Sequence, residues 1–337
     1  MTTSQLIKQR AGLHHGGRLL AAAKHYNIPL EQWLDLSTGI NPNAWPVPTI
    51  PGDVWSRLPE ENDGLEAAAR DYYGAEHLLP VAGSQAAIQA LPLLRTRARV
   101  AVLNPAYAEH AHAWKRAGHE VTPIGEHQID DAIAQADVLI LVHPNNPTGA
   151  RFTTQQLLTW HKQLSARGGW LIVDEAFMDS TPEHSLCQIG SQDGLIILRS
   201  LGKFFGLAGI RVGFVCAQPQ LLEQLHNLLG PWSVNAPARW VATKALQDKA
   251  WQQQCIQKLN EEGAKLNTLL TKHGFFPTGG CTLFQWILTP RAEQLHKQLA
   301  QEGVFTRLFT EPASLRFGLP KNEAEWQRLE IALVPTE

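Results

Sequence analysis

Cysteine is scarce in this sequence, which has four in 337 residues. They are far apart, with no Cys-x-x-Cys spacing, at Cys187, Cys216, Cys255 and Cys281. Such a small and scattered set argues against a secreted domain held together by disulfides. We therefore expect a reduced chain in the cytoplasm.

An excess of charge of either sign is also missing. The 29 Lys and Arg residues nearly balance the 31 Asp and Glu residues, so the formal net charge is −2. This balance gives no reason to expect nucleic acid or an anionic membrane as a partner. No apolar stretch approaches the length that crosses a bilayer, and residues 1–8 lack the apolar core of a signal peptide. We therefore expect a globular chain that acts on a small molecule.

Several catalytic and metal-binding motifs do not occur, among them His-Glu-x-x-His and Gly-x-Ser-x-Gly. Gly202-Lys203 does not belong to a P-loop, because Phe204 stands where that motif has Ser or Thr. His110 and His112 lie in a helix-like run, where residues two apart do not share a face. We therefore expect no metal site.

The hydrophobic pattern predicts an α/β fold. Short apolar runs without polar alternation are typical of strands buried on both faces of a mostly parallel sheet. They occupy residues 100–103, 138–142, 171–173, 195–198 and 212–216, separated by helical stretches near 107–117, 153–167 and 181–189. This pattern assigns residues 46–231 to a large α/β domain.

The two flanks of this domain have different patterns. Residues 236–272 are typical of helix, followed by strands at 283–288 and 314–317 and a helix around 291–302, which predicts a smaller α+β domain over 232–337. Residues 1–45 form an N-terminal arm, and a proline-rich segment follows from Pro42 to Pro59. We expect the arm to pack on the active site and the small domain, with the proline-rich segment crossing the mouth of the site.

The stretch from Ser200 to Gly213 concentrates the chemistry. Lys203 follows a predicted strand, in a glycine-rich loop, and precedes two phenylalanines. Partial burial lowers the pKa of an amine, and the neutral amine is the form that condenses with an aldehyde. Ser200 and Arg211 add a hydroxyl and a guanidinium, which suit a phosphate. Taken alone, Lys203 is more typical of a solvated surface lysine, and only the surrounding residues favour the reactive amine.

Other polar residues follow the ends of predicted strands. Gly83-Ser84-Gln85 opens a helix, where backbone N–H groups attract anions. Asp174 ends a buried strand, a place where α/β folds put ligand-binding groups. Tyr107 and Asn146 lie in loops after two further strands. Without more context these residues also fit caps, turns and generic loop positions.

Together these motifs resemble the fold-type-I enzymes that use pyridoxal 5'-phosphate (PLP), the aspartate aminotransferase-like proteins. The resemblance covers Ser-x-x-Lys followed by Gly-Leu-Ala-Gly-x-Arg, with Arg211 eight residues after Lys203, and the Asn-Pro-x-Gly motif that begins at Asn146. It implies PLP as cofactor, condensed with Lys203 and paired through its pyridine nitrogen with Asp174. The implied holders of its ring and phosphate are Gly83, Ser84, Gln85, Tyr107, Asn146, Ser200 and Arg211.

The N-terminal arm narrows the resemblance. His14-His15-Gly16-Gly17 and Asp35-Leu36-Ser37-Thr38-Gly39-Ile40-Asn41-Pro42 resemble signatures of the threonine-phosphate decarboxylases, which act in cobalamin (vitamin B12) biosynthesis. That family decarboxylates O-phospho-L-threonine to (R)-1-amino-2-propanol O-2-phosphate, and the resemblance also implies a homodimer. The implied substrate ligands are His15, Gly16, Gly17 and Asn41 for the phosphate, and Arg307 and Arg316, of which Arg316 is the main candidate for the carboxylate.

Two other functions stay open. One is a histidinol-phosphate-type aminotransferase, which needs a 2-oxo acid. The other is a PLP-binding regulator, which the absence of a basic DNA-binding module disfavours. Three positions depart from many aminotransferases, because Phe177 replaces a tyrosine near the cofactor, Leu58 replaces a tyrosine that reaches the neighbouring subunit, and Gly202 replaces a serine. These departures weigh more against an ordinary aminotransferase than against PLP binding.

Overall fold

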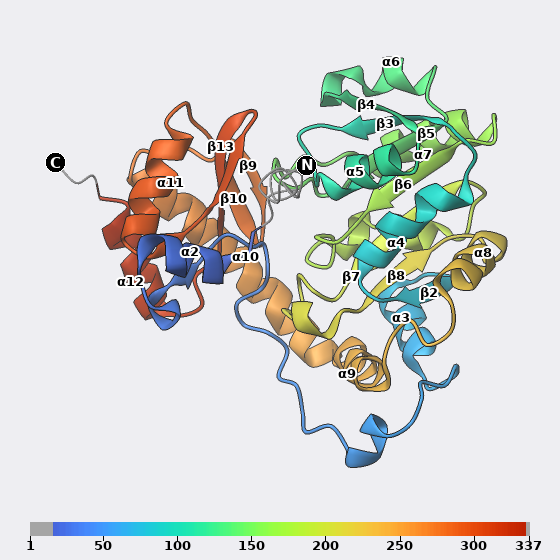
Figure 1. The fold of residues 1–337 in the computed structure, drawn as a ribbon, viewed down its shortest axis with the longest axis horizontal. Coiled ribbons are helices and arrows are strands. Elements are labelled where there is room, and N and C mark those ends of the chain that lie inside the picture. Colours follow the sequence, from blue (N-terminus) through green and yellow to red (C-terminus); the bar gives the residue numbers. More distant parts are fainter. Residues whose placement is uncertain (1–15, 335–337) are drawn as a thin grey trace, which may run out of the picture.

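A computed structural model describes residues 16–334 of the chain and shows two domains side by side (Figure 1). The large domain is built on a seven-stranded sheet. Across the sheet the strands are β2 (Leu78–Val81), β8 (Gly213–Cys216), β7 (Leu195–Ser200), β6 (Trp170–Asp174), β5 (Val138–Val142), β3 (Arg99–Leu103) and β4 (Glu120–Ile124). Only β8 runs antiparallel to its neighbours, so the predicted mostly parallel sheet is confirmed.

Helices cover both faces of this sheet, which explains why its central strands are continuous apolar runs. All five residues of β5 are buried. One face packs on α4 (Ser84–Ala90), α5 (Glu109–Arg116) and α8 (Pro219–Leu229). The other face packs on α3 (Leu65–Tyr73), α6 (Ile129–Ile133) and α7 (Thr154–Ser165). Short 3₁₀ turns complete the domain at η3 (Leu91–Leu94), η4 (Glu126–Gln128) and η7 (Ala208–Ile210).

The small domain contains a four-stranded antiparallel sheet. Its strands, in order across the sheet, are β12 (Arg307–Thr310), β13 (Ala313–Gly318), β10 (Phe284–Leu288) and β9 (Gly279–Cys281). Its helices are α10 (Lys249–Lys272), α11 (Ala292–Gln301) and α12 (Glu323–Ala332). Within residues 16–334, none of the helices is both long enough and apolar enough to span a membrane.

The helical region predicted over 236–272 is two helices. Asp248 separates α9 (Ala236–Gln247) from α10 and caps the latter, since its Oδ1 accepts from the backbone N–H of Trp251 at 3.1 Å. Helix α9 packs on α3, where the buried Arg239 pairs with Asp63 at 2.7 Å and Glu66 at 2.9 Å. By this packing α9 accompanies the large domain, whereas the sequence pattern assigns it to the small one.

The N-terminal arm packs mainly on the small domain. It contains α2 (Leu19–Tyr26), η1 (Leu30–Gln32) and β1 (Leu34–Asp35), and β1 pairs in parallel with β11 (Val304–Phe305). The proline-rich segment behaves differently from the expectation that it crosses the active site. Together with η2 (Gly52–Trp55), it extends from the body of the chain, with Trp55 65% and Leu58 64% exposed (Figure 1). Its prolines favour extended backbone, and although Trp45 near its start is buried, Trp55 and Leu58 remain exposed on the single chain.

Another expectation also needs correction. Residues 181–189 are not one helix but two 3₁₀ turns, η5 (Pro182–His184) and η6 (Leu186–Ile189). Ser185 lies between them in extended conformation, and its Oγ accepts from the backbone N–H of Cys187 at 3.1 Å. This local hydrogen bond competes with continuous helix.

Candidate active site

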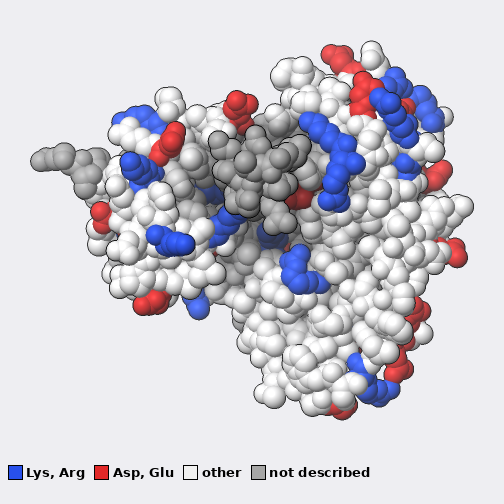
Figure 2. Space-filling view, in the orientation of Figure 1, with Lys and Arg blue, Asp and Glu red and all other residues white. Residues whose placement is uncertain are grey.

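The carboxyl ends of three adjacent parallel strands meet at the border between the two domains. Strand β5 leads into the loop with Asn146, β6 ends at Asp174, and β7 ends at Ser200, three residues before Lys203. Parallel strands place their carboxyl ends at one edge of the sheet, which is where ligands bind in α/β folds. Figure 2 shows Lys and Arg side chains beside the hollow between the domains.

Lys203 is half-buried, and its Nζ lies 5.4 Å from the centre of the Phe177 ring. Burial is the main reason that the pKa of this amine is lowered to about 8. The positive charge of Arg316, and less that of Arg211, lowers the pKa further, while Asp174 acts in the opposite direction. Among residues 16–334, no side chain holds the amine by a hydrogen bond or an ion pair. An unengaged amine of lowered pKa is neutral more often than an ordinary lysine, and the neutral form is the one that reacts with an aldehyde.

Asp174 has a partner that sequence reasoning missed. His110 of α5 donates from Nε2 to Asp174 Oδ2 at 2.9 Å, and both residues are buried. Asp174 Oδ1 accepts from the backbone N–H of Ala176 at 3.1 Å. The histidine therefore fixes the orientation of the carboxylate. From the sequence, His110 was examined only as a possible metal ligand. It is 64 residues away from Asp174 in the chain, so no local motif indicates that the two side chains pair.

The predicted phosphate-binding residues come together around Gly83. Gly83 has φ +72°, and a Cβ there would lie 2.7 Å from Arg211 Nη2. Arg211 also has a positive φ, and its Nη1 donates to the carbonyl of Ala208 at 3.1 Å. Helix α4 begins at Ser84, so the N–H groups of its first turn have no carbonyl of their own helix to bond. The bare backbone, the helix start and the guanidinium together fit a phosphate.

Tyr107 and Gln85 are linked to each other. The Tyr107 hydroxyl donates to Gln85 Oε1 at 3.2 Å, and Gln85 Nε2 donates to Glu109 Oε2 at 2.8 Å. Burial, with the charges of Glu109 and Asp174, raises the pKa of Tyr107 to about 12. Gln85 thus holds the phenol ring through its side chain, which leaves its backbone N–H as the group that suits a phosphate.

Arg316 bridges the two domains. Its Nη1 donates to Asn146 Oδ1 of the large domain, and its Nη2 donates at 2.7 Å to the carbonyl of Ser37 in the arm. The third nitrogen of the guanidinium group, Nε, is buried and has no partner among the described residues. Burial and the nearby charge of Arg307 lower the pKa of Arg316 to about 10. A buried guanidinium that keeps a free donor suits a carboxylate ligand.

Asn146 is also oriented by this contact. Because its Oδ1 accepts from Arg316, its Nδ2 remains the donor toward any ligand. Arg307 lies directly opposite Arg316 in the β12–β13 pair, so both side chains project from the same face of the small sheet. The two arginines therefore offer two anion-binding groups next to each other.

The glycines of the arm lie next to Ser37, the residue whose carbonyl Arg316 contacts. Gly17 donates from its backbone N–H to Ser37 Oγ at 2.8 Å, and Ser37 Oγ in turn donates to Asp35 Oδ1 at 2.6 Å. A Cβ at Gly16 would lie 2.3 Å from the Ser37 carbonyl oxygen, so only glycine fits. The Gly17 N–H is therefore already occupied and is a weaker candidate for a phosphate than predicted. His15 lies outside the described residues.

Asn41 is not placed as a substrate ligand. Its Nδ2 donates to the carbonyl of Phe204 at 2.8 Å and to Cys255 Sγ at 3.2 Å, and its backbone N–H donates to the carbonyl of Lys203 at 3.0 Å. The side chain is buried and fully used by these contacts. Asn41 therefore fixes the loop that carries Lys203, which corrects the expectation that it binds a phosphate.

A cavity of about 420 Å³ lies where the arm meets the small domain. Gly16, Arg18, Ser37, His296 and Arg307 are among the residues that line it. Burial and the nearby charge of Arg18 lower the pKa of Arg307, so two cationic side chains converge there. An anion in this cavity would relieve their mutual repulsion.

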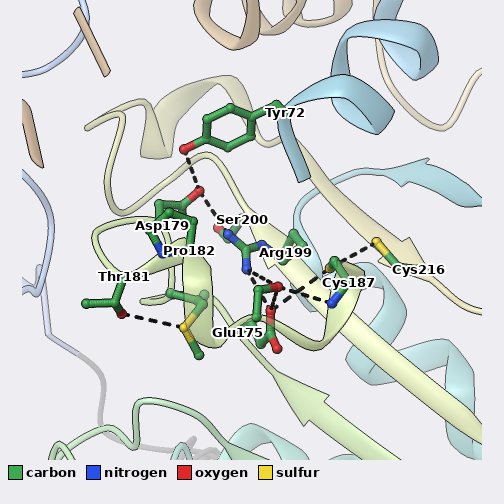
Figure 3. A network of polar contacts seen from close by, with 12 residues as sticks. Tyr72, Glu175, Asp179, Thr181, Pro182, Cys187, Arg199, Ser200 and Cys216 are labelled. Atoms are coloured by element: carbon green, nitrogen blue, oxygen red, sulfur yellow. Dashed lines mark hydrogen bonds and ion pairs between the residues drawn. The ribbon is translucent and has the colours of Figure 1, made fainter. Parts of the chain in front are cut away.

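A buried network supports the strand ends (Figure 3). Arg199, the residue before Ser200, lies between Glu175, at 2.7 Å, and Asp179, at 3.1 Å. The hydroxyl of Tyr72 donates to Asp179 at 3.1 Å, and Arg199 lies over the ring of Tyr73. Since Glu175 follows Asp174, this network ties β6 to β7 and keeps Asp174 and Ser200 in fixed relative positions.

The departures from many aminotransferases have different explanations. At Gly202, a Cβ would lie 3.3 Å from Ala208 Cα, so a serine would crowd this turn. Leu58 is 64% exposed in the proline-rich segment. Phe177 is buried beside Lys203, with its ring centre 5.2 Å from that of Phe284.

These residues fit PLP. The structure provides a buried carboxylate for a pyridine nitrogen, an unengaged amine of lowered pKa for an aldehyde, and a bare backbone cradle for a phosphate at Gly83. In residues 16–334 no group of three or more His, Cys, Asp or Glu side chains could hold a metal ion. The donor set thus suits an organic cofactor with an aldehyde and a phosphate.

Comparison with known proteins agrees with this chemistry. The family model for aminotransferase class I and II matches residues 59–335. A threonine-phosphate decarboxylase from Pseudomonas aeruginosa is 56% identical, covering 96% of this chain and 97% of the relative. Another from Sinorhizobium is 39% identical, covering 97% and 99%. The solved histidinol-phosphate aminotransferase of Sinorhizobium meliloti, in complex with pyridoxal-5'-phosphate, has the same fold, with TM-score 0.83 at 19% identity over 96% of this chain and 94% of that one. The chain therefore belongs to the class I and II aminotransferase family and, within it, to the threonine-phosphate decarboxylases.

Proposed function

We propose that this chain catalyses the PLP-dependent decarboxylation of O-phospho-L-threonine to (R)-1-amino-2-propanol O-2-phosphate, for cobalamin biosynthesis. The observation that carries the proposal is the pair of arginines on adjacent strands, Arg307 and Arg316, of which Arg316 lies near enough to Lys203 for its charge to act on the amine. A substrate with a carboxylate and a phosphate on neighbouring carbons needs two such anion-binding groups. Similarity to named threonine-phosphate decarboxylases over nearly the whole chain supports the same activity.

When bound, PLP supplies an electron-accepting ring that takes up the pair released when a bond to Cα breaks. Asp174 would hold the pyridine nitrogen in its protonated state, with His110 fixing the carboxylate. The Nδ2 of Asn146 would donate to the phenolic oxygen, and Tyr107 would lie on the ring face. Ser84, Ser200 and Arg211 would hold the phosphate of the cofactor.

Arg316 orients the substrate carboxylate through its unpartnered Nε and its exchangeable Nη donors. The bond from Cα to the carboxyl carbon then breaks, and the carboxylate leaves as carbon dioxide. A proton takes its place at Cα, and Lys203 delivers it as an ammonium and regains one from solvent. Because its pKa is about 8, Lys203 can both release and accept this proton near neutral pH.

The cavity between the arm and the small domain is the proposed site of the substrate phosphate. Arg18 and Arg307 provide the charge there, and Gly16 allows close approach of the backbone. Its position next to Arg316 matches a substrate whose phosphate and carboxylate both lie close to Cα.

We further propose that the chain works as a homodimer in the cytoplasm. Trp55 at 65%, Leu58 at 64% and Trp232 at 59% are among the twelve large apolar side chains that are exposed in the described part of a single chain. The extended segment of residues 46–58 would bury its apolar side chains against a second copy (Figure 1). All four cysteines are free and buried, as expected of a reducing compartment. Sedimentation velocity tests the dimer, and a single species at the mass of one chain would refute it.

The test of the activity is an incubation of the PLP-loaded protein with O-phospho-L-threonine and no 2-oxo acid. Release of carbon dioxide with formation of the amine phosphate, followed by mass spectrometry, is the expected result. Conversion of histidinol phosphate that requires 2-oxoglutarate, with no carbon dioxide, would replace the proposal by the aminotransferase alternative. Lys203→Ala is the matched control and abolishes either reaction.

A further inference from the structure

The space between Lys203 and Arg316 is bordered by two aromatic rings, those of Phe177 and Phe284. The Lys203 Nζ lies 5.4 Å from the centre of the Phe177 ring, and the Arg316 guanidinium carbon lies 5.1 Å from the centre of the Phe284 ring. The two rings meet edge to face, with centres 5.2 Å apart and an interplanar angle of 86°. We call Phe177 and Phe284 the aromatic wall. It extends from the amine of Lys203 to the guanidinium of Arg316.

Gly39 of the N-terminal arm packs against both rings of the aromatic wall. A Cβ at Gly39 would lie 2.8 Å from a ring carbon of Phe177 and 3.1 Å from a ring carbon of Phe284. The bare backbone of Gly39 therefore packs directly on both rings, and both phenylalanines are almost fully buried. Neither ring can offer a hydrogen bond, so this side of the site presents no polar side-chain group to a ligand.

The bond that breaks in the proposed reaction must lie along this aromatic wall. Its carbon atom Cα receives a proton near Lys203, and its carboxylate is held at Arg316. We propose that the aromatic wall favours loss of the carboxylate over retention, and that Phe177 is a specificity-determining residue for decarboxylation. This inference rests on the proposed function of the site.

The physical reason is the change in charge along the reaction. A carboxylate is stabilised strongly by water and hydrogen-bond donors, whereas carbon dioxide is neutral and gains little from them. An apolar surface beside the bond does not stabilise the bound carboxylate as water would, so the free energy of the carboxylate is raised. The free energy of the neutral product, carbon dioxide, is nearly unaffected. A polar group at the same place would stabilise the carboxylate and favour reactions that keep it, such as proton movement at Cα followed by amino transfer.

The decisive comparison is between Phe177→Leu and Phe177→Asn. Leu and Asn both branch at Cγ, and both are smaller than Phe, so neither can overfill the site. Leu fills more of the space than Asn, and the chemical difference between the two is the polar amide of Asn. Phe177→Leu keeps the apolar surface, and Phe177→Asn places an amide beside Lys203 and the substrate carboxylate.

Two measurements are made on each variant. The first is kcat for carbon dioxide release from O-phospho-L-threonine, together with the share of turnovers that end in amino transfer when 2-oxoglutarate is present. The second uses the cofactor-free protein and follows acetylation of Lys203 against pH by mass spectrometry, which reports the ionisation of its amine. Arg316, Asp174 and Arg211 are the charged groups that act on this amine, and none of them is changed.

We expect Phe177→Leu to keep kcat within about fivefold of the wild type, with the same product partition. Its acetylation midpoint should stay near pH 8 or fall slightly, because the ring that the ammonium faces is lost. Phe177→Asn should lose at least about tenfold in kcat, shift the partition toward amino transfer and move the acetylation midpoint upward, since the amide stabilises the ammonium. Equal behaviour of the two variants in both measurements would overturn the proposal. If the wild-type chain released no carbon dioxide, the proposed function would fail instead, and the acetylation midpoints would still decide whether Phe177 keeps the surroundings of Lys203 apolar.

Discussion

The ionisation of Lys203 gives the sharpest quantitative prediction. An ordinary lysine has a pKa near 10.5, and burial lowers that of Lys203 to about 8. At pH 7 about a tenth of such amines are neutral, compared with about one in three thousand at the ordinary value, a gain of roughly 300-fold in the reactive form. The cofactor-free protein should therefore bind PLP covalently at a rate that rises with pH and levels off above pH 8.

Two charge-removing substitutions should move this midpoint in opposite directions. Arg316→Gln removes a like charge, so the pKa of Lys203 rises, whereas Asp174→Asn removes an opposite charge, so it falls. Acetylation of Lys203 followed by mass spectrometry measures both midpoints without the cofactor. A wild-type midpoint near 10.5, or shifts of the same sign in the two variants, would refute the electrostatic account of the site.

Three further outcomes are expected. His110→Phe should weaken PLP binding by about tenfold to a hundredfold, because a buried hydrogen bond to a charged group is lost; titration of the absorbance of bound cofactor measures this, and an unchanged dissociation constant would remove His110 from the site. Arg239→Met should lower the free energy of unfolding by about 2–4 kcal/mol in urea, since the buried guanidinium joins α9 to Glu66 of α3 and to Asp63 just before that helix. Burial lowers the pKa of His143 from 6.5 to about 4, so only the unfolded chain takes up a proton between these values and stability falls as the pH drops from 6.5 toward 4; His143→Phe should recover up to about 3 kcal/mol of that loss, and an equal loss in both proteins would contradict this.

Much of the large domain could be predicted from the sequence. Its strands are buried on both faces, and that burial leaves continuous apolar runs that local pattern reveals. Strand β5 matches its prediction residue for residue. Strand β4 was missed because it lies at the sheet edge, where Glu120, Thr122 and Pro123 are exposed and the apolar run disappears.

In the site too, features that depend on local sequence could be predicted, whereas features that depend on contacts between distant residues could not. Lys203, Asp174 and Asn146 follow strand ends, so their convergence follows from the parallel order of the sheet. The roles of His110 and Asn41 depend on partners far along the chain, since Asn41 bonds to the carbonyl of Phe204, 163 residues away. A motif can place Asn41 near the site, but only the tertiary contacts decide that it supports the lysine loop and does not bind a ligand.

The arm motif gains a physical reason from these contacts. Asp35 accepts from the Ser37 backbone N–H at 2.9 Å and from its hydroxyl, and this fixes the Ser37 carbonyl that Arg316 Nη2 contacts. The Gly318 N–H donates to the Leu36 carbonyl at 2.8 Å, so the arm backbone runs directly against the end of β13, the strand that carries Arg316. The arm therefore fixes the position of Arg316, the proposed ligand of the carboxylate. Under the proposed function, a change in the arm would alter which bond of the substrate is aligned for cleavage, although Ser37 and Arg316 are about 280 residues apart in the chain.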